Sequence, residues 1–353
     1  KASTMLRNVS LLVICVAVSF AYIIGEFQEV EHNVYGTTHE QTYLSPALPL
    51  RPGWVIQSDA EKTPMKMPES GYITGFHAQV VDSQNKSVLL DEVYLHHWIL
   101  GDALGNGGPC QSLTYVLGVG AETRGTPIRF PAGYGLPLKP EMHWMASIHV
   151  LRTTHVEDVK HCIECHCPGG DNAGGGLQCC PTTAETNISC QTFPGSPTDM
   201  KTYYLRYTVT WQPLEDNLTP LTIYNFDVAD CNFQYNVPAC KGGDCVDFRE
   251  SSYTAKVDAD IVILVGHMHI GGINVTFSVN DKPIYTAYPT YGNGTTAGNE
   301  KGYLVAITTE SFPKPYQMFK GDKMTLSAHY HSNVYHDGVM GLCLVAVVEK
   351  PSK

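Results

Sequence analysis

Residues 203–211 have the sequence YYLRYTVTW, a run of aromatic and β-branched residues of the kind that favours β-strands. Similar short runs, bounded by Gly, Pro, Asn or Asp, occupy residues 72–76, 93–100, 261–265, 273–279 and 342–348. Beyond the N-terminal apolar segment, no long stretch has the apolar spacing of a helix. Many short strands separated by turn residues are typical of β-sandwiches, so the sequence predicts an all-β chain.

The chain of 353 residues is long enough for two domains. Residues 156–198 break the strand pattern, because they are rich in Cys and Gly and contain too few apolar residues to form a core. We interpret them as a disulfide-stapled excursion at a domain boundary. We therefore expect a first β-sandwich at residues 45–155 and a second at residues 199–350.

The N-terminus has the pattern of a secretory signal peptide. A short basic start at residues 5–7 precedes an apolar run at residues 9–21, which ends in the small-x-small sequence Ser-Phe-Ala. The alternative is a membrane anchor, but the run is short for a span and acidic residues follow it closely. We expect a signal peptide at residues 5–24, no membrane anchor after its cleavage, and secretion to the apoplast or the secretory-pathway lumen.

Composition restricts the class of partner. The chain is 43% hydrophobic and 16% charged, which is typical of a globular protein. Its net charge of -11 disfavours a nucleic-acid partner, because phosphate binding requires a basic surface. A small molecule is the expected partner, and the oligomeric state stays open.

The cysteine count agrees with export. One of the 12 cysteines, Cys15, lies in the predicted signal, so an odd number remains and at least one thiol stays unpaired. We expect this thiol to be Cys343, in the last apolar strand. The cluster of His and Cys at residues 161–167 could also suggest zinc, but an oxidising compartment favours disulfides. The disulfide candidates are Cys110, Cys162, Cys165, Cys167, Cys179, Cys180, Cys190, Cys231, Cys240 and Cys245.

Five Asn-x-Ser/Thr sequons that follow the predicted signal peptide predict a glycosylated surface. Asn217 is the poorest of them, because Pro220 directly follows its Thr219. The sequons are at Asn85, Asn187, Asn217, Asn274 and Asn293.

Several histidines lie in patterned places. His267 and His269 follow a buried-type run, and residues two apart on a strand point to the same side, so both imidazoles can reach one metal ion. The alternative is a polar pair on a solvent face. His96 and His97 are adjacent, so they share a metal only where the strand bends or where they use different ring nitrogens. His149, alone in a third apolar strand, would otherwise be a core histidine.

A further same-face pair, His329 and His331, has no local feature that decides its role. It is a possible second shell of a metal site, a ligand pair or part of an exposed polar strand.

The order of these motifs resembles the copper type II, ascorbate-dependent monooxygenases, of the peptidylglycine α-hydroxylating and dopamine β-monooxygenase type. The motifs are Tyr72-Ile73-Thr74-Gly75-Phe76, His96-His97-Trp98, Pro131-Ala132-Gly133-Tyr134-Gly135, His149-Val150, His267-Met268-His269 and Met340 before Gly341-Leu342. The cysteine spacing at residues 162–165 and 179–180, together with residues 266–272, resembles the plant stress up-regulated nodulin family more closely.

The monooxygenase resemblance implies two jelly-roll-like β-sandwiches flanking an open cleft. It implies two copper ions per chain, with ascorbate as reductant and molecular oxygen as co-substrate. His96, His97 and His149 would hold an electron-transfer copper, and His267, His269 and Met340 would hold the catalytic, oxygen-binding copper. Imidazole suits both copper oxidation states, and a thioether favours Cu(I).

The sequence departs from the peptide-amidating members of that family. Val265, Leu342 and Leu344 occupy places where those members carry polar and charged groups that hold a peptide carboxylate. An unpaired carboxylate in an aliphatic pocket is costly, so the expected substrate is a small neutral or apolar metabolite oxidised at a C–H bond. The alternative function is a non-enzymatic apoplastic stress or copper-binding protein on the same fold.

Overall fold

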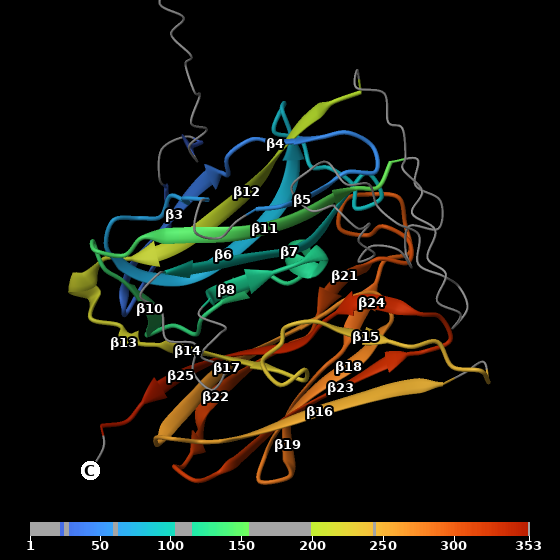
Figure 1. Ribbon diagram of the computed structural model, residues 1–353. Helices are drawn as coiled ribbons and strands as arrows, with labels where there is room; N and C mark the ends of the chain where they lie inside the picture. Colours follow the sequence, from blue (N-terminus) through green and yellow to red (C-terminus); the bar gives the residue numbers. More distant parts are fainter. Residues whose placement is uncertain are drawn as a thin grey trace, which may run out of the picture.

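The structure is a computed structural model that describes residues 22–24, 28–58, 63–102, 115–154, 199–242 and 245–351. The all-β prediction is confirmed, and the six predicted strand runs all lie within strands. The described helical elements are two short 3₁₀ turns, η2 (Ala121–Arg124) and η3 (Leu214–Asp216). None of the helices in the described part of the chain could cross a bilayer. Figure 1 shows one sandwich, coloured mostly blue to green, above a second, coloured yellow to red.

The larger sheet of the first sandwich has the strand order β1-β3-β12-β6-β10-β13, with β2 on β3, β4 on β12 and β9 on β6. Its pairings are antiparallel except for that between β10 and β13. The strands are β1 (Tyr22–Ile23), β2 (Gln28–Asn33), β3 (Gly36–Leu44), β4 (Leu48–Leu50), β6 (Gly71–Asp82), β9 (Ile128–Arg129), β10 (Tyr134–Leu138), β12 (Lys201–Gln212) and β13 (Thr219–Pro220).

The smaller sheet of the first sandwich faces this one, in the order β5-β11-β7-β8. Its strands are β5 (Val55–Gln57), β7 (Val93–Asp102), β8 (Tyr115–Val119) and β11 (Trp144–Arg152). Rings from both sheets meet between the layers: the Trp98 ring centroid lies 4.7 Å from that of Phe76 and 5.1 Å from that of Tyr207. Burial of these large rings is a main source of stability for the sandwich.

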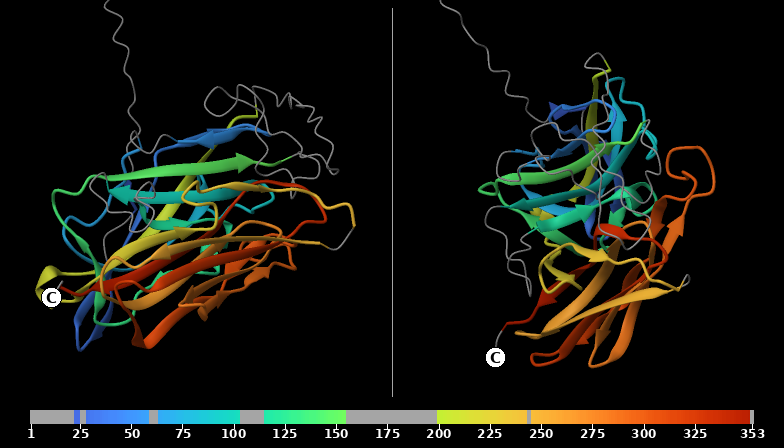
Figure 2. Two further views of the ribbon diagram at one scale, coloured as in Figure 1. Left: turned by 60° about the horizontal axis from the view of Figure 1, so that its bottom comes forward. Right: turned by 45° about the vertical axis from the view of Figure 1, so that its right-hand side comes forward.

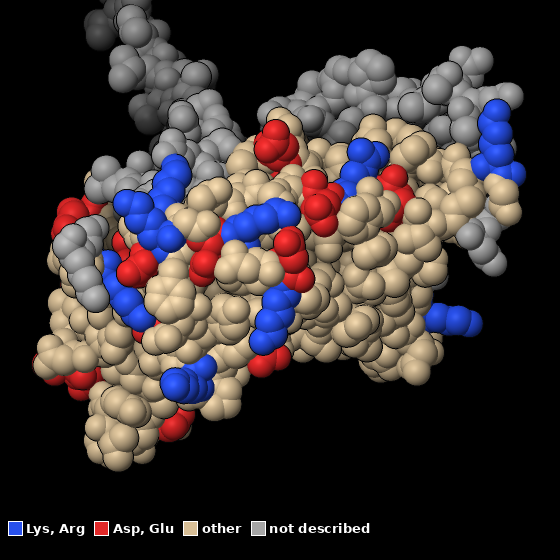
Figure 3. Space-filling view, turned by 90° about the horizontal axis from the view of Figure 1, so that it is seen from below, with Lys and Arg blue, Asp and Glu red and all other residues tan. Residues whose placement is uncertain are grey.

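The second sandwich packs the sheet β14-β25-β17-β22 against the sheet β16-β23-β18-β19, with two ribbons, β15-β24 and β20-β21, at its margin. The strands are β14 (Thr222–Asp227), β15 (Tyr235–Val237), β16 (Val246–Thr254), β17 (Ala259–Met268), β18 (Gly272–Val279), β19 (Lys282–Ala287), β20 (Pro289–Tyr291), β21 (Leu304–Ile307), β22 (Thr309–Met318), β23 (Lys323–His331), β24 (His336–Val339) and β25 (Gly341–Glu349). On the face seen from below in Figure 3, acidic and basic side chains are interspersed.

The domain boundary lies later than the sequence predicts. Strand β12 follows the cysteine-rich stretch but pairs with β3 and β6, and it is the yellow-green strand in the upper half of Figure 1. Every second residue along β12 is buried in the core of the first sandwich: Tyr203, Leu205, Tyr207 and Val209. Burial of these side chains stabilises the pairing of β12 with the first sandwich. The second sandwich therefore begins at β14.

The structure describes only the last three residues, 22–24, of the predicted signal peptide. Residues 5–21 of the predicted signal peptide at 5–24 lie outside the described residues. Tyr22 and Ile23 pair with Leu44 and Tyr43 of β3, so the end of the predicted segment belongs to the first sheet. The cysteine-rich residues 156–198 also lie outside the described residues, as do Cys110 and Asn187.

The structure describes some of the cysteines and most of the sequon asparagines. Cys240 and Cys245 form a disulfide, and Cys231 is also disulfide-bonded. Cys343 is the free cysteine among the described residues and is fully buried, as predicted. The described sequon residues are Asn85, Asn217 and Asn293, which are exposed, and Asn274, which is half-buried.

The two sandwiches pack directly on each other where an open cleft was expected. Strands β17 and β25 carry apolar residues on both faces, as strands buried on two sides do. Val262, Val265 and Leu344 join the core of the first sandwich, whereas Leu264 and Val345 join the second core. Both views in Figure 2 show the two halves side by side. Along β17 and β25 the described residues therefore form a packed apolar layer between the two sandwiches, in place of the expected open cleft.

Candidate metal centre

A β-bulge brings His96 and His97 together. Strand β7 pairs His97 with His149 and Leu95 with Val150 of β11, so His96 is an extra residue without an opposite partner in the register. A bulge re-aims a side chain that would otherwise point to the other face. As a result the Nδ1 atoms of His96 and His97 lie 2.8 Å apart. The bulge supplies the bend that adjacent histidines need to share a metal ion.

His149 completes the first histidine set. Its ring centroid lies 4.3 Å from that of His96 and 5.1 Å from that of His97. All three histidines are buried, and one ring nitrogen from each lies within 4.8 Å of the others. The structure therefore gathers the three residues that the sequence grouped as one ligand set.

His267 and His269 converge as their spacing predicts. They lie at the end of β17 and just beyond it, and their Nε2 atoms are 3.0 Å apart. The Nδ1 atom of His267 lies 2.7 Å from Oε1 of Glu122, a buried carboxylate on η2. A carboxylate that accepts a hydrogen bond from Nδ1–H fixes the tautomer and leaves Nε2 as the metal-binding nitrogen.

The two histidine sets are in contact. The ring centroids of His96 and His269 lie 4.2 Å apart with their planes at 78°. His97 and His267 line one pocket. Five imidazoles from the two sandwiches thus form a single cluster, which we call the five-histidine cluster: His96, His97, His149, His267 and His269.

Burial keeps three of these histidines, His96, His97 and His269, uncharged. Desolvation lowers the pKa of His97 to about 3 and lowers the pKa values of His96 and His269 well below the ordinary value. The neighbouring imidazoles add to the shift, because positive charges at this separation would repel one another. Neutral imidazole is the form that binds a metal ion.

The spacing of the ring nitrogens fits a metal ion. Two imidazoles bound to one ion at about 2.0–2.1 Å and at roughly 90–110° place their nitrogens about 3 Å apart. The separations of 2.8 Å between His96 and His97 and 3.0 Å between His267 and His269 agree with this value. The donor set is therefore chemically and geometrically suited to copper or zinc, and all-imidazole ligation suits copper.

Met340 lies in the wall of the same pocket as His97 and His267 and is fully buried. Tyr330 connects this residue to the cluster, since its hydroxyl accepts a hydrogen bond from the backbone N–H of His269 and donates one to the carbonyl of Met340. Val265, Leu342 and Leu344 form aliphatic parts of the wall. The free volume is about 20 Å³, which is enough for about one water molecule.

His329 and His331 do not belong to the cluster. His329 lies with its Nδ1 3.0 Å from Oδ1 of Asn274, and its ring centroid is 5.0 Å from that of Phe248. His331 is exposed. Tyr330, which lies between them in sequence, points to the opposite side of β23 and is the residue that reaches the cluster. The alternation of a strand explains why the two flanking histidines point away.

Sequence reasoning missed Glu122, Tyr330 and His336. Glu122 lies on an isolated 3₁₀ turn, and no local pattern marks its contact with a residue 145 positions away. His336 is buried against the turn that follows His269: a Cβ atom added at Gly271 would lie 2.4 Å from its Cε1. Only the His-Tyr-His alternation offered a signal, since it places Tyr330 on the face opposite the histidines.

No curated protein sequence matches the chain. The solved structures that it resembles include PBCV-1 VP54 fitted into a reconstruction of the virophage Sputnik, at 7% identity and a TM-score of 0.31, covering 91% of this chain and 95% of that one. A structure of infectious bursal disease virus Gx strain has 11% identity and a TM-score of 0.17, with coverages of 94% and 75%. Likenesses this weak carry no argument about function.

A family model describes most of the chain. The model of the family called stress up-regulated Nod 19 matches residues 36–104 and 101–350. These ranges contain all five histidines of the cluster, as well as Glu122 and Met340. The chain therefore belongs to the stress up-regulated Nod 19 family.

Proposed function

We propose that this protein is a secreted copper-dependent oxidoreductase of the monooxygenase type. The observation that carries the proposal is the five-histidine cluster, in which imidazoles from both sandwiches meet with nitrogen separations of 2.8 and 3.0 Å and four of the five side chains are buried. A structural role seldom requires five imidazoles in contact, four of them buried, because each buried polar ring needs a polar partner. Metal ligation satisfies them together.

The two histidine sets have different surroundings. His96, His97 and His149 would hold one copper ion within the first sandwich. His267 and His269, with Met340 nearby, would hold a second ion beside the small pocket. Copper bound there supplies one-electron redox chemistry and reactivity with molecular oxygen, and ascorbate is the proposed reductant.

The residues around the second set would control access and orientation. Glu122 holds the His267 ring through Nδ1, and Tyr330 holds the His269 backbone. Val265, Leu342 and Leu344 keep the wall aliphatic, so a charged substrate would lose its hydration without a partner. We therefore propose a small neutral or apolar metabolite as the substrate, which would require the pocket to open beyond its free volume of about 20 Å³.

That small volume favours a second candidate function. A pocket that holds about one water has no room for an organic molecule, as expected of a non-enzymatic copper-binding protein of the apoplast. Such a protein would bind copper at the same histidines and would not consume oxygen beyond the rate of free copper.

One experiment separates these functions. The secreted full chain is loaded with copper, its metal content is measured, and oxygen uptake is followed with ascorbate and a panel of neutral aromatic and aliphatic compounds. We expect two copper ions per chain and substrate-dependent oxygen uptake. His149→Ala should lose copper, whereas the matched control His329→Ala, outside the cluster, should retain it. Stoichiometric copper without substrate-dependent uptake supports the non-enzymatic function, and absence of bound copper contradicts both.

A further inference from the structure

A second and larger pocket lies next to the turn that follows His269. Its volume is about 590 Å³, in the range of pockets that bind small molecules. It lies between the start of β16, the end of β23 and the segment before β24. The described lining residues are Cys245, Val246, Ile270, Gly271, Tyr291, His331, Asn333, Val334 and His336. We call it the outer pocket.

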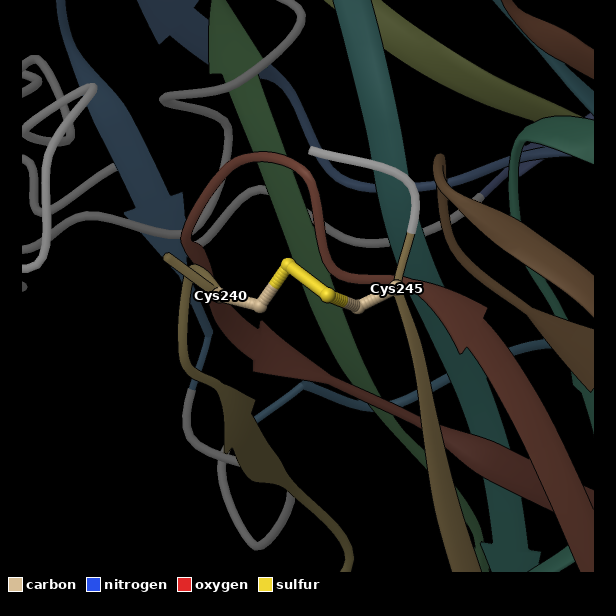
Figure 4. Close-up of a disulfide and its surroundings, with 2 residues drawn as sticks. All are labelled: Cys240 and Cys245. Atoms are coloured by element: carbon tan, nitrogen blue, oxygen red, sulfur yellow. A yellow bond between two sulfur atoms is a disulfide. The ribbon is translucent and has the colours of Figure 1, made fainter. Parts of the chain in front are cut away.

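One wall of the outer pocket is held by the Cys240–Cys245 disulfide, shown in Figure 4. The backbone N–H of Ser332 donates to the carbonyl of Cys245 at 2.9 Å, and the N–H of Cys240 donates to the carbonyl of Ser332 at 2.8 Å. Cys240 and Cys245 are thereby both held against the end of β23. A covalently closed and hydrogen-bonded wall favours a preformed pocket, which lowers the entropic cost of binding.

The lining defines the chemistry of the ligand. Among the described lining residues there is no Lys, Arg, Asp or Glu, so an ionic ligand would lose hydration without gaining an ion pair. The imidazoles of His331 and His336 and the amide of Asn333 offer hydrogen bonds. The Tyr291 ring offers a stacking surface, and Val246, Ile270 and Val334 are aliphatic. These features suit a flat, uncharged ring that carries hydroxyl groups.

The outer pocket is connected to the five-histidine cluster through the glycine turn. The hydroxyl of Tyr291 accepts a hydrogen bond from the N–H of Gly271 at 3.1 Å and donates one to the carbonyl of Gly272 at 2.8 Å. The N–H of Gly272 in turn donates to the carbonyl of His269 at 3.1 Å. A molecule that stacks on Tyr291 therefore lies against the turn that positions His269.

His336 gives a second connection on the same side. Its ring packs on Gly271, and its centroid lies 6.3 Å from that of Tyr330, whose hydroxyl accepts the His269 backbone N–H. The outer pocket therefore offers a ligand-sized space beside the turn that follows His269. The pocket lined by Met340, in contrast, has room for about one water molecule.

We propose that the outer pocket binds a small neutral phenol or catechol, with its ring on Tyr291 and its hydroxyls hydrogen-bonded to His331, His336 or Asn333. This site goes beyond the proposed function, because binding there needs no metal ion and no redox step.

The test uses the metal-free full chain and 4-methylcatechol as the probe, with binding followed by calorimetry and by NMR of the histidine side chains. Val246→Trp places a large ring in the pocket from an exposed strand position and should weaken binding at least tenfold, or about 1.4 kcal/mol. Phe248→Trp is the matched control, because Phe248 is equally exposed on β16 but does not line the pocket. It should bind as the unaltered chain does.

Three results would overturn the inference: no binding of 4-methylcatechol, equal binding by Val246→Trp, or tighter binding of the anion 4-methylbenzoate. Copper content is measured on separate samples of the same preparations. A chain that binds the catechol but no copper would refute the proposed function alone, and one that binds copper but no catechol would refute this inference alone.

Discussion

The Nδ1 atom of His267 lies 2.7 Å from Oε1 of Glu122, across 145 residues of sequence and across the junction of the two sandwiches. The same carboxylate oxygen accepts a hydrogen bond from the backbone N–H of Gly120 at 3.1 Å. Glu122 is thus held by its own turn while it holds the imidazole from the other sandwich. This contact sets the ring orientation and tautomer of His267.

Replacement of Glu122 should weaken metal binding without unfolding the chain. Glu122→Gln keeps the size of the side chain and one acceptor oxygen but removes the charge, so the hydrogen bond that orients the His267 ring weakens. We expect copper affinity to drop by about 10–100-fold, as for other residues that support metal ligands. A competition titration with a copper chelator measures this. Glu349→Gln, whose carboxylate bonds Tyr224 instead, is the control, and equal affinities in the two variants would contradict the assigned role.

Gly120 should tolerate no side chain. A Cβ atom there would lie 2.6 Å from Cε1 of His267 and 2.9 Å from the carbonyl oxygen of His96, so both histidine sets would have to shift. We expect Gly120→Ala to lower thermal stability, by about 1–3 kcal/mol, and to lower copper content. Gly242→Ala, whose Cβ would meet Cys245 Sγ only at 3.9 Å, is the control. Unchanged copper content in Gly120→Ala would show that the cluster does not depend on this close approach.

The thioether of Met340 should matter for oxygen chemistry and little for the fold. Met340→Leu conserves volume in a fully buried position and removes the sulfur, so we expect a change in stability below about 1.5 kcal/mol. Ascorbate-driven oxygen uptake should fall at least tenfold, while copper at His96, His97 and His149 stays bound. Met324→Leu, buried in the second core, is the control. Full oxygen uptake by Met340→Leu would show that Met340 is not part of the oxygen-binding site.

The free thiol of Cys343 should be inert in the folded chain. Complete burial raises the pKa of this thiol well above its ordinary value, and the thiolate is the reactive form. We expect iodoacetamide at pH 8 to leave Cys343 unmodified until the chain is unfolded in denaturant. Mass spectrometry of the peptide that contains Cys343 reads this directly. Rapid alkylation under native conditions would mean that β25 is not packed as the structure describes.

Local sequence predicts much of this fold. The alternating and apolar runs place six strands correctly, because strand formation is largely local. The two-residue spacing of His267 and His269 predicts their convergence, although His269 lies just past the end of β17. The isolated position of Cys343 likewise indicates a thiol without a partner, and the structure confirms this.

Non-local packing explains what the sequence does not predict. The bulge that unites His96 and His97 exists only in the register between β7 and β11. The return of β12 to the first sandwich depends on which core buries its aromatic face, and a composition break at residues 156–198 cannot show this. The contact between His96 and His269 requires that the sandwiches pack together, which only the two-sided burial of β17 and β25 makes possible.

The most direct test of the central claim is copper-edge anomalous diffraction from crystals of the copper-loaded full chain. The account predicts strong anomalous peaks within bonding distance of His96, His97 and His149 and of His267 and His269, with the imidazoles still gathered at the junction of the two sandwiches. Absence of anomalous density at these histidines, or copper found only elsewhere on the chain, would contradict it.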